Sequence, residues 1–195
     1  MMFPTRQLPA MPTIRFVAAA LALLLTTLSP LTRAAAQGTG EVSTSPAGAR
    51  GLVGAYDEQN PFAKILRGEL ETAKVYEDER VLVFLSNGAV SRGHALVISK
   101  TSKARNVLEM DPDEYGRLMA VARRVAFAQR AAFKADGFTI SQNNGEAAGQ
   151  SVFHLHIHVV PRYTGQPLQP SRNPPATVAE LTPIARELAA ALKLP

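Results

Sequence analysis

Three of the four histidines in this 195-residue chain occupy alternate positions of one short segment: His154, His156 and His158. Alternate side chains of a β-strand point to the same face, so a strand over 151–160 would place the three rings in a row about 7 Å apart. The residues at the intervening positions are all apolar and are expected to face the core: Phe153, Leu155, Ile157 and Val159. Neighbouring imidazoles repel one another when charged, so at least some of these rings should be neutral near pH 7.

Two chemistries suit such a row of imidazoles. A neutral imidazole nitrogen can attack phosphorus and form a covalent intermediate, while neighbouring donors stabilise the phosphate oxygens. Alternatively, two or three imidazoles can bind a metal ion, most often zinc. The flanking segments 143–145 (Asn-Asn-Gly) and 149–151 (Gly-Gln-Ser) favour phosphate chemistry, because they supply amide, hydroxyl and backbone N–H groups. A metal site would more naturally include a carboxylate, and the nearest one, Glu146, is in a loop.

The segment from Gln150 to Val160 resembles the signature of the histidine-triad (HIT) family, in which histidines and apolar residues alternate after Gly-Gln. The resemblance extends from about Asn60 to Arg162 and includes the segment 93–98 and the Asn-Asn-Gly loop. It implies a hydrolase or nucleotidyltransferase that cleaves at the α-phosphate of nucleotide conjugates. Candidate substrates are nucleoside phosphoramidates, dinucleoside polyphosphates and adenylated molecules.

The resemblance also implies a role for each matching residue. His156 would be the nucleophile and would form a nucleotidyl-histidine that water then hydrolyses. His154 and His158 would contact phosphate and hold the nucleophile's ring, and Ser151 would hydrogen-bond or protonate the leaving group. Further substrate contacts would come from residues outside the triad: His94, Asn143, Gln150, Ser86 and Asn87.

The chain departs from the family pattern at two groups of positions. The acid that binds the ribose hydroxyls in family members is replaced by Ser86, and a proline three residues later by Ala89, so Asn87 becomes the substitute candidate for the ribose contact. Many bacterial members hold a structural zinc ion with a Cys-x-x-Cys pair and a histidine. The matching positions here are Asn60, Ala63 and Ser102. No metal and no cofactor is therefore expected.

Two other hypotheses remain open beside the enzyme. The missing ribose-binding acid favours a non-catalytic nucleotide-binding protein, and the row of imidazoles allows a histidine-ligated metal-binding protein. Under all three hypotheses the triad has to be presented on one face of a sheet, and the remaining sequence predicts the elements that do so.

Strand and turn patterns predict an α+β domain with one mostly antiparallel sheet. The five expected strands cover 75–76, 81–85, 94–99, 138–142 and 151–160. Asn60 and Pro61 are typical of a helix start and Gly68 of a helix end, which indicates a short N-terminal helix. The expected fold is thus a single HIT-like domain with a five-stranded sheet, this short helix, a long helix and a C-terminal helix.

Capping residues define the two longer helices. Asp111 is the expected N-cap of the long helix, and Glu114 completes a capping-box arrangement. Apolar residues at helical spacing carry this helix to about Lys134. The last helix is expected over 177–193, where Pro183 either kinks it or makes Thr182 its first residue.

The first 36 residues have the pattern of a signal peptide. Arg6 and Arg15 precede an apolar run over 16–28, and this run is shorter than the ~20 residues that span a bilayer as a helix. Three alanines at 34–36 supply small residues for cleavage. The expected organisation is a signal peptide (1–36), a flexible lead-in (37–55), a HIT-like catalytic domain (56–165), and a proline-rich loop with the C-terminal helix (166–195). The protein is expected to be exported, to a periplasm or beyond.

The net charge and the cysteine content limit which classes of partner are expected. The net charge of +5 includes three arginines within the first 36 residues, which contain no acid, so 21 − 3 = 18 basic residues face 16 acidic residues in the remainder. An excess of two basic residues does not indicate nucleic-acid binding, which requires clustered basic residues. The absence of cysteine excludes disulfides and thiolate chemistry. The expected partners are a nucleotide or nucleotide-conjugate substrate, the membrane only during export, and a second copy of the chain, because the family's sheet often extends across a homodimer.

Overall fold

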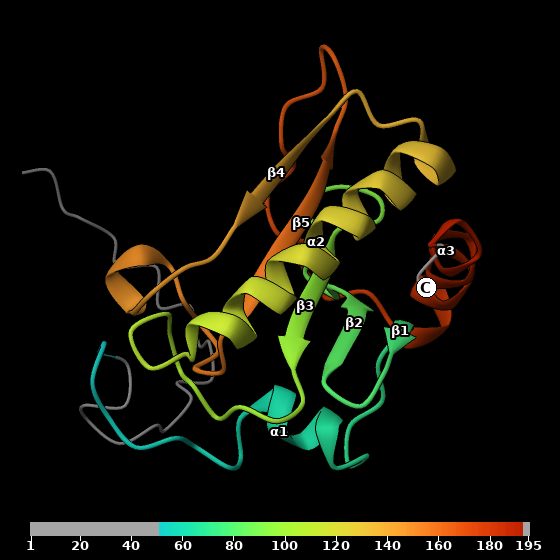
Figure 1. Ribbon diagram of the computed structural model, residues 1–195. Helices are drawn as coiled ribbons and strands as arrows, with labels where there is room; N and C mark the ends of the chain where they lie inside the picture. The colour runs from blue at the N-terminus through green and yellow to red at the C-terminus, as the bar shows by residue number, and fades with distance from the viewer. Residues whose placement is uncertain (1–50, 193–195) are drawn as a thin grey trace, which may run out of the picture. The chain divides into compact units, whose positions relative to one another are not determined.

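A five-stranded antiparallel sheet carries the histidines (Figure 1). This computed structural model describes residues 51–192, so the predicted signal peptide over 1–36 lies outside the described residues. The strands follow in the spatial order β1 (Lys74–Glu77), β2 (Val81–Leu85), β3 (Ala95–Ser99), β5 (His156–Arg162) and β4 (Gly137–Ser141). The helices are α1 (Pro61–Leu66), α2 (Pro112–Phe133) and α3 (Val178–Ala191), with a 3-10 turn η1 (Glu146–Ala148). The predicted α+β fold is confirmed.

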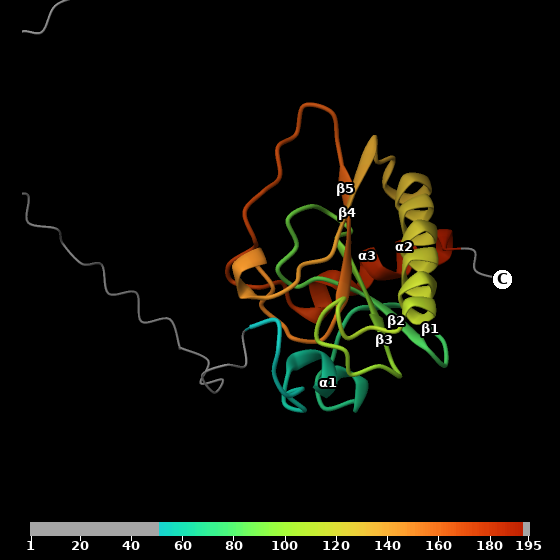
Figure 2. The same cartoon turned by 60° about the vertical axis from the view of Figure 1, so that its left-hand side comes forward.

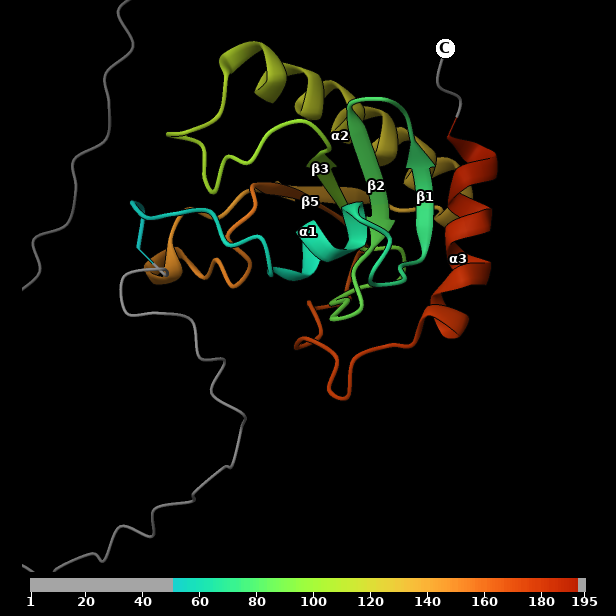
Figure 3. The same ribbon diagram turned by 90° about the horizontal axis from the view of Figure 1, so that it is seen from below.

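The two faces of the sheet have different coverings. The long helix α2 and the C-terminal helix α3 pack on one face, as the view along the sheet edge shows for α2 (Figure 2). This face contributes Leu155, Ile157 and Val159 to the main core, as the alternating pattern predicts. The expectation for Phe153 was wrong, because it precedes β5 and is only half-buried, with the Arg105 guanidinium 5.0 Å from its ring centroid. The other face has a smaller apolar cluster in which Phe62 of α1 packs on strand residues of β2 and β3. The short helix α1 therefore covers the face that carries the histidines (Figure 3).

The helix starts follow the capping chemistry of the sequence. The Asn60 side chain accepts hydrogen bonds from the backbone N–H groups of Phe62 and Ala63, and it begins α1. The Thr177 hydroxyl and the Glu180 carboxylate form a complete capping box at the start of α3. That helix begins at Val178 and contains Pro183, so the alternative start at Thr182 is wrong. Among the described residues, no helix has both the length and the apolar character needed to cross a bilayer.

The predicted capping box of α2 is only half formed. Asp111 is the N-cap, and its side chain accepts from the backbone N–H groups of Asp113 and Glu114. The Glu114 carboxylate instead accepts hydrogen bonds from the Ser99 hydroxyl at 2.8 Å and from the Arg80 guanidinium at 2.9 Å. This long-range pairing replaces the local one because the carboxylate is buried against the end of β3, where Ser99 offers a donor.

The fifth strand begins later than predicted. It starts at His156 rather than at residue 151, and it extends to Arg162. The backbone N–H of Leu155 donates to the carbonyl of Ala104 at 2.8 Å, a residue in the loop after β3, so the chain enters the sheet only after this contact. His154 therefore lies just before the strand, and only His156 and His158 belong to it.

The C-terminal part of the chain is joined to the same core. After β5 the proline-rich segment runs past the loop between β2 and β3, where the Gln169 N–H donates to the Val90 carbonyl and the Ala176 N–H to the Asn87 carbonyl. The apolar side chains of α3 then pack with α2 and the sheet, through Leu181, Ala185 and Leu188. Residues 166–192 thus help to enclose the core.

Candidate active site

The histidines continue two rows of side chains across the sheet. His156 lies opposite Ile98 of β3, which lies opposite Leu82 of β2. His158 lies in the same way opposite Leu96, which lies opposite Phe84. An apolar surface therefore extends from the histidine rings across two strands.

Phe62 of α1 stands against this surface. Its ring centroid is 5.0 Å from that of His156 and 5.4 Å from that of Phe84, with the rings nearly perpendicular. The histidines are consequently desolvated, since His154 is 2% exposed and His156 is 5% exposed. The sequence analysis predicted the short helix but assigned Phe62 no contact with the site; the residue follows Pro61 in α1 and is buried.

Burial keeps the four histidines of the site neutral. It lowers the pKa values of His94, His154 and His156 from 6.5 to about 4, and it also lowers the pKa of His158. The charges that neighbouring rings would carry add to this effect at His94. At neutral pH each ring therefore has one N–H donor and one acceptor nitrogen, and the partners of each ring decide which nitrogen is which.

Main-chain groups settle the proton positions of His156 and His154. The Nδ1 atom of His156 lies 2.8 Å from the carbonyl oxygen of His154, and a carbonyl can only accept. Nδ1 of His156 therefore donates, and Nε2 carries the lone pair. The Nε2 atom of His154 lies 3.1 Å from the carbonyl oxygen of Ser99, so Nε2 is the donor in that ring and Nδ1 is the acceptor.

A second chain of hydrogen bonds orders His94 and His158. The backbone N–H of Val90 donates to Nδ1 of His94 over 3.4 Å, so this ring carries its proton on Nε2. His94 Nε2 lies 2.9 Å from Nδ1 of His158 and donates to it. His158 consequently holds its own proton on Nε2. The site thus combines a lone pair on His156 with an N–H donor on the neighbouring ring, whose centroid is 4.8 Å away.

The loop before β5 is held by Gln150. Its buried side chain accepts from the Gly145 N–H at 2.8 Å and donates to the carbonyls of Arg105 and Val152 at 2.6 and 3.0 Å. These bonds fix the loop that leads into the histidine segment. The predicted substrate contact of Gln150 stays a prediction, and it would have to replace one of these bonds.

The other predicted contact residues border the histidines on two sides. Asn143 is half-buried at the start of the loop, where its amide is 3.5 Å from the Gly149 carbonyl, and Ser151 is exposed at the loop's end. On the opposite side, the Ser86 N–H donates to the His94 carbonyl at 2.9 Å, which places Ser86 beside that histidine. Asn87 follows it and is exposed. Their contacts with a substrate also stay predictions.

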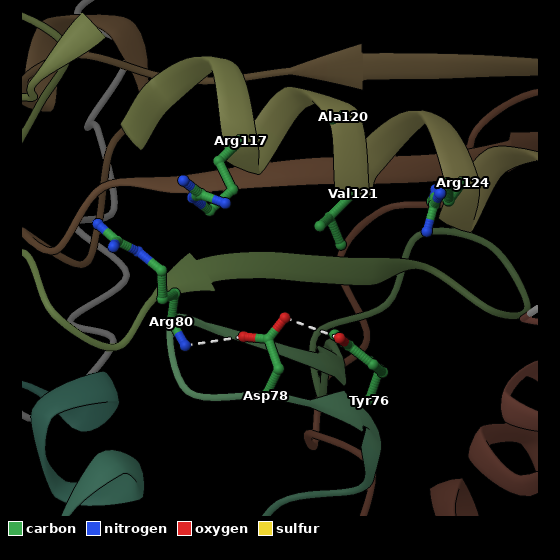
Figure 4. Close-up of a pocket in the computed structure, with 7 residues that line it drawn as sticks. All are labelled: Tyr76, Asp78, Arg80, Arg117, Ala120, Val121 and Arg124. Carbon is green, nitrogen blue, oxygen red and sulfur yellow. Dashed lines mark hydrogen bonds between the residues drawn. The ribbon is translucent and has the colours of Figure 1, made fainter. Parts of the chain in front are cut away.

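The α2 face contains a hollow of about 330 Å³ with a different character (Figure 4). Its lining includes Arg80, Arg117 and Arg124, and the Glu114 carboxylate lies 2.9 Å from the Arg80 guanidinium and 3.9 Å from that of Arg117. Asp78 already accepts from the Tyr76 hydroxyl and the Arg80 N–H (Figure 4). Because it lies on the sheet face opposite the histidines, this hollow is not part of the site.

The positions that the resemblance associates with structural zinc do not fit that ion. The Asn60 side chain caps α1, Ala63 has no ligating atom, and the Ser102 hydroxyl accepts from the backbone N–H of Ala104 at 3.1 Å. Within residues 51–192, no three histidine, cysteine, aspartate or glutamate side chains are grouped so as to hold a metal ion.

The lowered histidine pKa values predict a pH-dependent stability. Between pH 6.5 and about 4 the unfolded chain binds protons that the folded chain does not, so the free energy of unfolding falls as the pH falls. Each buried histidine should add about 1.4 kcal/mol per pH unit to the slope of the free energy of unfolding in this window. Above pH 6.5 the histidines should add no slope. Urea denaturation at a series of pH values measures the slope. His94→Asn should show a shallower slope, whereas an unchanged slope would contradict the assignment to histidines.

Comparisons with known proteins agree with this geometry. The HIT domain family model matches residues 67–165. Protein hit of Bacillus subtilis is 46% identical over 102 residues, which are 52% of this chain and 70% of that protein. An adenylylsulfatase of Arabidopsis thaliana is 40% identical over 104 residues, which are 52% of this chain and 51% of that protein.

Solved structures with a similar fold come from the same family. A crystal structure of a Hit-like protein from Bartonella henselae matches with a TM-score of 0.67 at 38% identity, covering 71% of this chain and 100% of that chain. The family model covers half of the chain and includes every histidine of the site. The chain therefore belongs to the histidine-triad (HIT) family.

Proposed function

We propose that this protein cleaves nucleotide conjugates at the α-phosphate, with Nε2 of His156 as the nucleophile. The observation that carries the proposal is the hydrogen bond from His156 Nδ1 to the His154 carbonyl, because it leaves a lone pair on Nε2 of a neutral ring. Membership of the HIT family supports it, and a relative named as an adenylylsulfatase fits a substrate of this class.

The reaction would proceed in two displacements. In the first, the Nε2 lone pair forms a bond to the α-phosphorus while the bond from phosphorus to the leaving group breaks, and the leaving group takes a proton, for which the Ser151 hydroxyl is the proposed donor. In the second, water attacks phosphorus and gives up a proton that restores the Ser151 hydroxyl, and the electron pair of the P–N bond returns to Nε2. The products are a nucleoside monophosphate and the protonated leaving group.

The site residues would stabilise the charges that develop in these steps. The His156 ring becomes cationic once both nitrogens are substituted, and the His154 carbonyl that accepts from Nδ1 stabilises this charge. The Nε2–H of His158 is a donor for a phosphate oxygen. Both contributions are strong because the rings lie in a desolvated environment.

The nucleoside would lie along the apolar rows beside the histidines. A hollow of about 280 Å³ is lined on its apolar side by Ile65 and Leu66 of α1, by Leu82 of β2 and by Leu70, and on its polar side by Glu71, Lys74 and Glu77. Leu82 is two strands from His156, about 10 Å across the sheet, which suits a base attached through ribose to the α-phosphate. Ser86 and Asn87, at the end of β2, are the proposed ribose contacts.

Intact-mass analysis with an adenosine phosphoramidate tests the proposal. The wild-type protein should show a transient nucleotidyl adduct on His156 and release adenosine monophosphate. His156→Ala should lose turnover by at least a thousandfold, because the nucleophile is absent. Arg124→Ala, in the hollow on the α2 face, is the matched control and should retain activity.

The same experiment separates the other hypotheses. Nucleotide binding without an adduct or turnover in the wild-type protein would indicate a non-catalytic binder. Stoichiometric zinc by elemental analysis, lost on replacing His156, would indicate a metal-binding protein. Full activity of His156→Ala would overturn the assignment of the nucleophile.

We also propose that the protein forms a homodimer through β4. This strand lies at one edge of the sheet, and its side chains Phe138 and Ile140 are 36% and 40% exposed. Ile140 lies opposite Val159, so both side chains are on the α2 face of the sheet. An exposed edge strand with apolar side chains is a template for pairing with another chain. Family members often form dimers, which supports this partner.

Ile140→Glu should weaken this dimer at least tenfold, because it places a charge within the apolar contact. Light scattering coupled to size-exclusion chromatography over a dilution series measures the effect. Leu108→Glu, at an exposed apolar side chain in the loop after β3, is the control and should leave the dimer intact. A monomeric wild-type protein would contradict the proposal.

We further propose that the protein acts after export. This rests on the sequence alone, through the basic residues and the short apolar run that precede Ala36. N-terminal sequencing of the protein purified from the cells that produce it should find a first residue near Gln37. A retained Met1 or Met11 would contradict cleavage.

A further inference from the structure

Tyr56 contacts the triad from outside the part of the chain that carries the family match. It lies in the segment before α1, whereas the family model begins at residue 67. Its hydroxyl oxygen is 2.6 Å from Nδ1 of His154, 98 residues away, and the two rings meet edge to face with centroids 5.7 Å apart. Sequence analysis assigned Tyr56 no role, because no local pattern indicates a contact over that separation.

The direction of this hydrogen bond is fixed by the opposite side of the ring. His154 Nε2 donates to the Ser99 carbonyl, and the ring is neutral, so Nδ1 has no proton. The tyrosine hydroxyl must therefore donate. Burial raises the pKa of Tyr56, so the hydroxyl keeps its proton at neutral pH.

We propose that Tyr56 is a positioning residue for the nucleophile, because its hydroxyl acts together with the Ser99 carbonyl to hold the His154 ring in the Nε2–H form and so keeps the His154 carbonyl aligned with Nδ1 of His156. This inference rests on the proposed function for its effect on catalysis. In the other neutral form of His154, Nε2 and the Ser99 carbonyl would face each other as two acceptors. The ring would then turn away from Ser99, and the peptide that orients His156 would shift with it.

The segment around Tyr56 is anchored at several points. Arg105 donates to the Gly51 carbonyl at 3.2 Å, and the Asn106 amide donates to the Leu52 carbonyl at 2.7 Å. Lys103 lies over the Tyr56 ring, 6.0 Å from its centroid. In Figure 3 this segment passes beside the η1 turn, next to the loop that Gln150 holds. The anchoring restricts the tyrosine to one place, as a positioning role requires.

Tyr56→Phe removes the hydroxyl and keeps the ring. We expect kcat for the phosphoramidate to fall about tenfold, the effect of one hydrogen bond to a buried ring, with KM nearly unchanged. Tyr76→Phe is the matched control, because it removes the hydroxyl bonded to Asp78 on the opposite face of the sheet, and it should leave kcat unchanged.

Long-range ¹H–¹⁵N spectra of the histidine rings test the inference independently of activity. Wild type and Tyr76→Phe should show His154 with its proton on Nε2. In Tyr56→Phe the bond to the Ser99 carbonyl remains but Nδ1 loses its donor, so the Nδ1 ¹⁵N resonance should move downfield, toward that of a nitrogen without a hydrogen bond. A proton on Nδ1 in the wild-type protein, or an unaltered His154 spectrum and kcat in Tyr56→Phe, would overturn the inference.

If the wild-type protein formed no adduct, the proposed function would fail, while the spectra would still decide the role of Tyr56. If Tyr56→Phe did not fold, the wild-type spectrum would decide the form of His154, and Tyr56→Trp, which retains a ring N–H donor, should restore folding and part of kcat.

Discussion

The site depends on a hydrogen bond between a side chain and the main chain two residues before it, from His156 Nδ1 to the His154 carbonyl at 2.8 Å. This bond selects which nitrogen of the ring has the lone pair. The lone pair exists only while the ring is neutral, and burial lowers the pKa of His156 to about 4, so the ring is neutral near pH 7. It also requires the His154 peptide to stay in place, which the Ser99 carbonyl and the Tyr56 hydroxyl ensure through the His154 ring.

Burial and chemistry are divided between the two faces of the sheet. The face under α2 and α3 holds most of the core, including Leu155, Ile157 and Val159. The other face has only a small apolar cluster, and Phe62 supplies its contact with the histidines. Because the same strand serves both faces by alternation, packing on one face fixes the direction of the histidines on the other.

Much of this arrangement could be predicted from the sequence, because it depends on local periodicity and capping. Alternation identified the core side of the histidine segment, and Asn60 and Asp111 identified two helix starts. The failures involve contacts between distant residues. The Glu114 carboxylate bonds to the Ser99 hydroxyl and not to the N-terminal end of its own helix. The Leu155 N–H donates to the Ala104 carbonyl, so β5 begins only at His156. No short pattern in the sequence encodes such pairings.

The main-chain atoms at Ser99, Val90 and His154 have a consequence for how this site can change over evolution. They set the proton positions of three histidine rings, yet each contributes only a carbonyl or an N–H group. Any residue other than proline supplies both groups. The side chain at 90 can therefore change to suit packing or a different substrate while the proton positions on the imidazoles persist, so long as the backbone path is kept. The side chain at 99 is constrained separately, because its hydroxyl donates to Glu114.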